Sequence, residues 1–69
     1  MEIFANRLRE LRLEKSMTLK QVSSSLNMPL MTYANYEQGK RQPSLETLSL
    51  LCDFYDVSAD YLIGRTDSY

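Results

Sequence analysis

The chain has no histidine and a single cysteine, Cys52, among its 69 residues. A zinc finger needs four Cys or His ligands and a disulfide needs two cysteines, so both are excluded. Nucleophilic catalysis by a Ser–His or Cys–His pair is excluded as well, because no histidine can act as the base. We therefore expect no enzyme activity, no catalytic residue and no cofactor. An unpaired cysteine is typical of a reducing compartment, which predicts a cytoplasmic protein in which Cys52 is a small buried apolar residue.

Long apolar runs are also missing. No stretch approaches the ~20 apolar residues of a membrane-spanning helix, so we expect no contact with a membrane. Sixty-nine residues make one domain at most, too small for a deep catalytic cleft, and we expect no small-molecule ligand. Asp53, Asp56 and Asp60 resemble a metal cluster only superficially, because their spacing divides them between two predicted helices. We expect a solvated face there and no metal.

Net charge is small but unevenly distributed. The whole chain carries −1 at pH 7. Seven basic and four acidic residues give residues 1–43 a net charge of +3, whereas one basic and five acidic residues give residues 44–69 a net charge of −4. A basic front can present one face to an anion, although a solvated surface with segregated charges gives the same totals. The charge pattern leaves both interpretations open.

Helical signals begin at the N-terminus, and no segment shows the alternation of a β-strand. In residues 3–15, Phe4, Leu8 and Leu11 recur at helical spacing. Thr18-Leu19-Lys20-Gln21 is a capping-box pattern, which predicts a second helix over 18–26. Pro29 suits a first helical turn, so the third helix is expected over about 29–38 and ends at Gly39.

Serine N-caps mark the remaining helices. Ser44 precedes a fourth helix over 45–55, and Ser58 precedes a short helix that ends at Gly64. These elements predict an all-α fold, a compact five-helix domain over residues 1–64 with a short polar tail at 65–69. The fourth helix is expected to turn these residues inward: Leu45, Leu48, Leu51, Cys52 and Tyr55.

The segments 18–26 and 29–38, joined by a short turn, have the dimensions of a helix-turn-helix. In that motif the first helix crosses the phosphate backbone and the second lies in the major groove of DNA, which is ~12 Å wide. Two-helix hairpins are common, so the spacing alone does not establish binding to a nucleic acid.

Two long stretches carry a resemblance to a known family. The segments "RLRELRLEKSMTLKQVSSSLNM" and "YEQGKRQPSLETLSLLCDFYDVSADYLIG" resemble the Cro/lambda-repressor-type helix-turn-helix domain of phage and bacterial transcriptional regulators. The resemblance covers residues 6–64 and is most specific over 36–45 and 57–64. It implies a five-helix lambda-repressor-like fold, a dimer in many members, and sequence-specific binding to an operator. Asn27 stands where the family usually has a turn glycine, and asparagine tolerates the same left-handed conformation.

The third helix has two faces of different character. At 100° per residue, Tyr33, Tyr36 and Glu37 fall on one side, and two tyrosines together indicate a core face. Glu37 needs a cation there, for which Arg12 is the candidate; the alternative is a solvent-exposed Glu37 near the helix end. The resemblance favours the pair, because the family's matching arginine locks the first helix to the third. The opposite face carries Met31, Ala34, Asn35 and Gln38.

The resemblance also implies which residues contact DNA. The positions that face the bases match Leu30, Met31, Thr32 and Asn35. Asn35 can hydrogen-bond adenine N6 and N7 together, whereas Leu30 and Met31 can only contact thymine methyl groups or exclude water. Many members carry Gln, Arg or Ser at the first two positions, so burial or a protein contact is the alternative there. Contacts to phosphates are expected from Thr18, Leu19, Gln21, Lys40, Arg41 and Gln42.

These patterns lead to two interpretations of function. The first is a DNA-binding transcriptional regulator, expected to be a repressor of phage or bacterial type. It would bind double-stranded DNA as a homodimer on an inverted-repeat operator, because two-fold pairing places two reading helices ~34 Å apart. The alternative is a protein-interaction module, such as an antitoxin or anti-repressor, which the sequence pI of ≈ 5.2 and the apolar reading face favour. Candidates for the two-fold interface are aromatic residues in excess of one small core: Phe54, Tyr55, Tyr61 and Tyr69.

Overall fold

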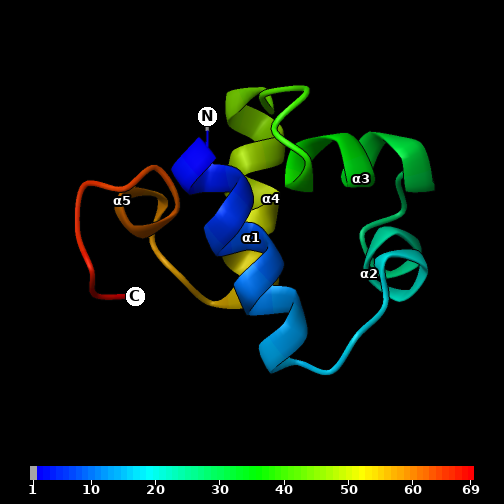
Figure 1. Ribbon diagram of the computed structural model, residues 1–69, viewed down its shortest axis with the longest axis horizontal. Coiled ribbons are helices and arrows are strands. Elements are labelled where there is room, and N and C mark those ends of the chain that lie inside the picture. The colour runs from blue at the N-terminus through cyan, green and yellow to red at the C-terminus, as the bar shows by residue number, and fades with distance from the viewer. Residues whose placement is uncertain (1) are drawn as a thin grey trace.

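Residues 2–69, which the computed structural model describes, form five α-helices and no strand. Figure 1 shows α1 in the middle of the molecule, with α2 and α3 on one side and α5 on the other. The expected all-α fold is therefore confirmed, and its helix ends lie within about two residues of the predicted positions. The helices are α1 (Glu2–Glu14), α2 (Leu19–Ser25), α3 (Leu30–Glu37), α4 (Leu45–Tyr55) and α5 (Ala59–Leu62).

Short-range hydrogen bonds explain where the helices begin. The hydroxyl oxygens of Thr18, Ser44 and Ser58 each accept a hydrogen bond from the backbone N–H three residues later, as N-caps do. Pro29 is the N-cap of α3 and supplies no such bond, so α3 begins at Leu30 without a side-chain cap. No helix within residues 2–69 is both long and apolar enough to cross a bilayer.

Left-handed residues end the second and third helices. Asn27 has φ 55° after α2, as expected for the substitute of a turn glycine. Gly39 has φ 74° after α3, and its N–H donates to the Tyr36 carbonyl while the Lys40 N–H donates to the Asn35 carbonyl. This pair of bonds is a Schellman motif, which closes the C-terminus of α3 and sets the direction of the following loop.

The hydrophobic core draws on every helix. The five largest fully buried side chains come from five different helices, and burial of each apolar side chain of this size contributes roughly 1.5–3 kcal/mol. In chain order from α1 to α5, these residues are Leu8, Val22, Tyr33, Leu51 and Leu62, and all belong to one hydrophobic cluster.

Two expectations about helix faces are wrong. Leu45 was expected to point inward but is 85% exposed, because it occupies the first turn of α4, beyond the edge of the core. Ala34 was expected on the outward face of α3 but is only 7% exposed. Since α3 contacts both α1 and α2, more of its circumference is covered than helical periodicity alone suggests.

The segment 65–69, expected to be a polar tail, folds back on α1. The Arg7 guanidinium donates hydrogen bonds to the carbonyl oxygens of Tyr61 and Thr66 and to the Asp67 carboxylate, and it stacks 4.3 Å from the centre of the Tyr61 ring. The Arg7 side chain therefore holds the segment 65–69, although Arg7 is one of the seven basic residues that give residues 1–43 their positive charge.

The aromatic residues near the C-terminus are used within one chain. Tyr55 is buried, Phe54 and Tyr61 pack against the core, and Tyr69 makes an edge-to-face contact with Tyr61. The Tyr69 hydroxyl donates to the Glu14 carboxylate, and this hydrogen bond raises the Tyr69 pKa. Fewer aromatic side chains are therefore left over for a two-fold interface than the composition suggested.

Candidate nucleic-acid interface

The underside of α3 is fixed by buried tyrosines. Tyr33 and Tyr36 are buried, and the Tyr33 hydroxyl lies 2.6 Å from the Tyr55 hydroxyl of α4. Burial raises the pKa of Tyr33, and it raises the pKa of Tyr55 to about 12, so both phenols stay neutral at physiological pH. The hydroxyl pair satisfies two polar groups that would otherwise be unpaired inside the core.

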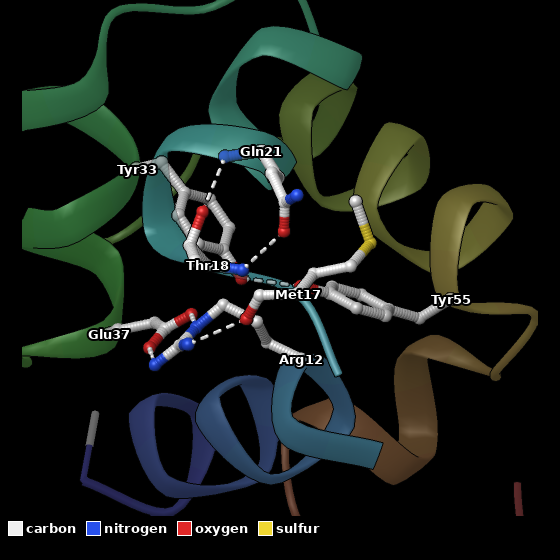
Figure 2. Close-up of polar contacts among 7 residues, drawn as sticks. All are labelled: Arg12, Met17, Thr18, Gln21, Tyr33, Glu37 and Tyr55. Carbon is white, nitrogen blue, oxygen red and sulfur yellow. Dashed lines mark hydrogen bonds and ion pairs between the residues drawn. The ribbon is translucent and has the colours of Figure 1, made fainter. Parts of the chain in front are cut away.

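An ion pair joins α3 to α1 beside these tyrosines (Figure 2). Arg12 Nε lies 2.8 Å from Glu37 Oε2, and Arg12 Nη2 lies 3.1 Å from Glu37 Oε1. The third donor, Nη1, reaches the Met17 carbonyl at 2.9 Å. The side chains of Arg12 and Glu37 are 13% and 5% exposed, so Glu37 is not at the surface. The hydrogen bonds to Glu37 raise the Arg12 pKa, and the guanidinium thus ties α1, the loop before α2 and the end of α3 together.

The first turn of α2 is closed by the capping box that the sequence predicted. The Gln21 N–H donates to Thr18 Oγ1 at 3.1 Å, and the Thr18 N–H donates to Gln21 Oε1 at 2.9 Å (Figure 2). The Gln21 side chain therefore keeps its NH2 group for an external acceptor, while its oxygen is already used. Leu19, the next expected contact residue, is half-buried and packs against the core, so only part of its side chain reaches the surface.

The outer face of α3 is open. Met31 is 71% exposed and Leu30 is 47% exposed, while Thr32 and Asn35 are half-buried. All four expected base-contacting residues are thus brought together on one short helix, whose first turn carries three of them. The loop that follows α3 carries the exposed residues Lys40, Arg41 and Gln42.

A groove runs between the start of α2 and the outer side of α3. Thr18 and Leu19 line it together with Leu30 and Met31. The other two expected base-contacting residues, Thr32 and Asn35, do not line it. Sequence reasoning missed Met17, whose apolar side chain directly before the N-cap is the signal that could have revealed it. We call this feature the apolar groove; its apolar lining residues are Met17, Leu19, Leu30, Met31 and Ala34, and its polar lining residues are Arg12, Thr18, Lys20 and Gln38.

Comparison with known proteins identifies the same domain. A helix-turn-helix family model matches residues 8–62. The HTH-type transcriptional regulator AnsR of Bacillus subtilis (strain 168) is 45% identical over 60 residues, which is 87% of this chain and 52% of AnsR. The HTH-type transcriptional regulator ImmR of the same organism is 38% identical over 61 residues, 88% of this chain and 48% of ImmR. The cryptic phage CTXphi transcriptional repressor RstR of Vibrio cholerae is 30% identical over 66 residues, 96% of this chain and 60% of RstR.

The chain spans about half the length of these curated relatives, between 48% and 60%. The match nevertheless includes all of α2 and α3, the loop after α3, and both partners of the ion pair. The chain therefore belongs to the helix-turn-helix family, and its predicted kinship with Cro/lambda-repressor-type transcriptional regulators is confirmed.

Proposed function

We propose that this chain binds double-stranded DNA in a sequence-specific manner and regulates transcription, as a repressor acting at an operator in the cytoplasm. The activity is binding and not catalysis. The observation that supports it best is the contrast between the two sides of α3, whose inner side is fixed by Tyr33, Tyr36 and Glu37 while Met31 stands 71% exposed. A rigid helix with a free outer face can enter the major groove without rearrangement.

Base recognition is assigned to the outer face of α3. The Asn35 amide donates to N7 and accepts from N6 of one adenine, a pairing that discriminates by ~1–3 kcal/mol. The Thr32 hydroxyl serves as a neutral donor or acceptor, and Leu30 and Met31 contact apolar groups in the groove.

Phosphate contacts flank this face on both sides. Lys40 and Arg41 are exposed in the loop after α3, where the Schellman motif directs the chain away from the helix, and Gln42 adds a neutral bond. At the start of α2, Thr18 supplies its hydroxyl, Leu19 its backbone N–H, and Gln21 the NH2 group that the capping box leaves available.

We propose further that two copies bind one inverted-repeat operator. One chain presents a single reading helix, which covers one half-site. Two-fold pairing would place the two α3 helices ~34 Å apart, about one turn of DNA, so that each covers one half-site.

Selection of bound sites from a random duplex pool tests the proposal. The expected result is an inverted repeat, with one A·T pair per half-site whose recognition is lost in Asn35→Ala. On that site Asn35→Ala lowers affinity by about 5- to 150-fold, equivalent to ~1–3 kcal/mol. Asn6→Ala, which alters an exposed asparagine on α1, is the matched control and keeps full affinity. If Asn35→Ala selects the same site with the same affinity, its assignment is wrong.

Salt dependence separates the phosphate contacts from the base contacts. Lys40→Ala and Arg41→Ala should each weaken binding to all sequences alike and reduce the slope of log K against log salt by about 1. Asn35→Ala should leave that slope unchanged.

The exposed side chains of Leu30 and Met31 favour a second candidate function, a protein-interaction module that uses the same face against a partner protein. Titration with random duplex at low salt distinguishes the two. Non-specific binding at micromolar concentrations supports the regulator, whereas its absence supports the interaction module.

A further inference from the structure

The described residues include three methionines, and their surroundings differ. Met17 and Met28 are half-buried and pack against the hydrophobic core. Met31 is 71% exposed on the outer face of α3. Its sulfur is therefore open to dissolved reagents, whereas neighbouring side chains shield the other two. Because an oxidant must reach the thioether sulfur to react with it, Met31 should be oxidised before Met17 and Met28.

The single cysteine does not compete with Met31 for an oxidant. Cysteine reacts with peroxides as the thiolate, so its reactivity depends on the thiol pKa and on exposure. Cys52 is 9% exposed, and burial raises the pKa of its thiol, so the thiol stays covered and protonated at neutral pH. Met31 thus carries the most accessible oxidisable sulfur in residues 2–69.

We propose that Met31 is a redox-sensitive modification site, at which reaction with a peroxide reversibly lowers DNA binding. A sulfur lone pair attacks one oxygen of hydrogen peroxide, the S–O bond forms and the O–O bond breaks. The sulfur is oxidised, the peroxide is reduced, and the proton of the transferred oxygen moves to the departing oxygen, which leaves as water. The product is methionine sulfoxide, which methionine sulfoxide reductases convert back to the thioether.

Oxidation at Met31 changes the outer face of α3 and leaves the inner face as it is. This inference rests on the proposed DNA-binding function and adds a regulation to it. The sulfoxide is polar and hydrated, and contact with DNA strips that hydration, which should lower affinity about 10-fold. Tyr33, Tyr36 and Glu37 hold α3 from the other side, so the modified chain keeps its fold.

Treatment of the full chain with hydrogen peroxide, followed by peptide mass spectrometry, tests the reactivity of the site. Met31 sulfoxide should form before the sulfoxides of Met17 and Met28. A saturating amount of the selected duplex should slow its formation, because bound DNA covers the outer face of α3. Thermal melts should be unchanged as long as Met17 and Met28 are still reduced.

Titration of the oxidised chain with the same duplex tests the regulation. The affinity should be about 10-fold lower than that of the untreated chain, and treatment with methionine sulfoxide reductases should restore it. Met31→Leu is the matched control, because it keeps an apolar side chain of similar volume and the other three methionines. The same peroxide treatment should leave the affinity of this variant at its own untreated value.

The outcomes are distinguishable. Slower oxidation of Met31 than of Met17 or Met28 overturns the modification site. Unchanged affinity after oxidation of Met31, or equal oxidation rates with and without duplex, overturns the regulation and leaves DNA binding intact. An equal loss of affinity in peroxide-treated Met31→Leu assigns the effect to another residue and overturns the proposal. An untreated chain that binds no duplex, even at low salt, overturns the proposed function together with this regulation.

Discussion

Replacement of Arg12 by alanine should destabilise the fold severely. Removal of the guanidinium leaves the Glu37 carboxylate, 5% exposed, without its two charge-assisted hydrogen bonds, and it leaves the Met17 carbonyl without its donor. Breaking a buried pair by removing one partner costs ~3–5 kcal/mol. A domain of this length has a total free energy of unfolding of only about 3–10 kcal/mol, so Arg12→Ala removes a large part or all of it.

Thermal and urea unfolding, followed by circular dichroism, measure this loss. We expect the melting temperature of Arg12→Ala to fall by at least about 12 °C, since each kcal/mol shifts a domain of this size by ~4–8 °C. Arg9→Ala removes an exposed arginine from the same helix and is the matched control, with a change within ~0.5 kcal/mol.

A double variant separates the loss of the pair from the burden of an unpaired charge. Arg12→Met combined with Glu37→Leu replaces both charges by apolar side chains of similar volume, which is often neutral for a buried pair. We expect it to recover most of the stability that Arg12→Ala loses. An Arg12→Ala domain that melts together with Arg9→Ala would refute the reasoning, because Glu37 would then be satisfied without its partner.

Three further predictions concern stability. The Tyr55 pKa is raised to about 12 by burial, so the free energy of unfolding should fall between pH 10 and pH 12, where Tyr55 of the unfolded chain loses its proton and Tyr55 of the folded chain keeps it. Tyr55 contributes up to about 1.4 kcal/mol per pH unit to this decline, and urea titrations of Tyr55→Phe should show a shallower one. Leu45→Ala should change stability by less than ~0.5 kcal/mol and Leu51→Ala by ~2–5 kcal/mol in the same titrations, because the first leucine is exposed and the second fully buried. Arg7→Ala should release the segment 65–69, and hydrogen exchange should show a faster rate at the Ser58 N–H, which donates to the Tyr69 carbonyl; an unchanged rate would mean that Arg7 does not hold the segment.

Helix starts were predictable because their causes are local. Thr18 and Ser58 each bond the backbone three residues later, so four consecutive residues contain the whole signal. The burial of individual helix residues was not predictable in the same way. The exposure of Leu45 and Ala34 differs from what helical periodicity predicts, because it depends on how α3 and α4 pack against the other helices.

The candidate site also has one part that the sequence predicts and another part that only the fold defines. The outer residues of α3 and the loop after it are contiguous in sequence, and the family resemblance placed them together. The contacts of Arg7 span 54 to 60 residues, and the Tyr33–Tyr55 hydroxyl pair spans 22, so no local pattern reveals them. The apolar groove also depends on the angle between α2 and α3, which only the folded chain defines.

The Arg12–Glu37 tie beneath α3 has a consequence for how such a protein changes over generations. Since the ion pair and the tyrosines act on one side of α3, a substitution at Met31 on the other side changes the proposed DNA-contacting surface without weakening the contacts that hold the helix. Proteins with this architecture can acquire a new target through surface substitutions alone and keep the thermal stability of the fold.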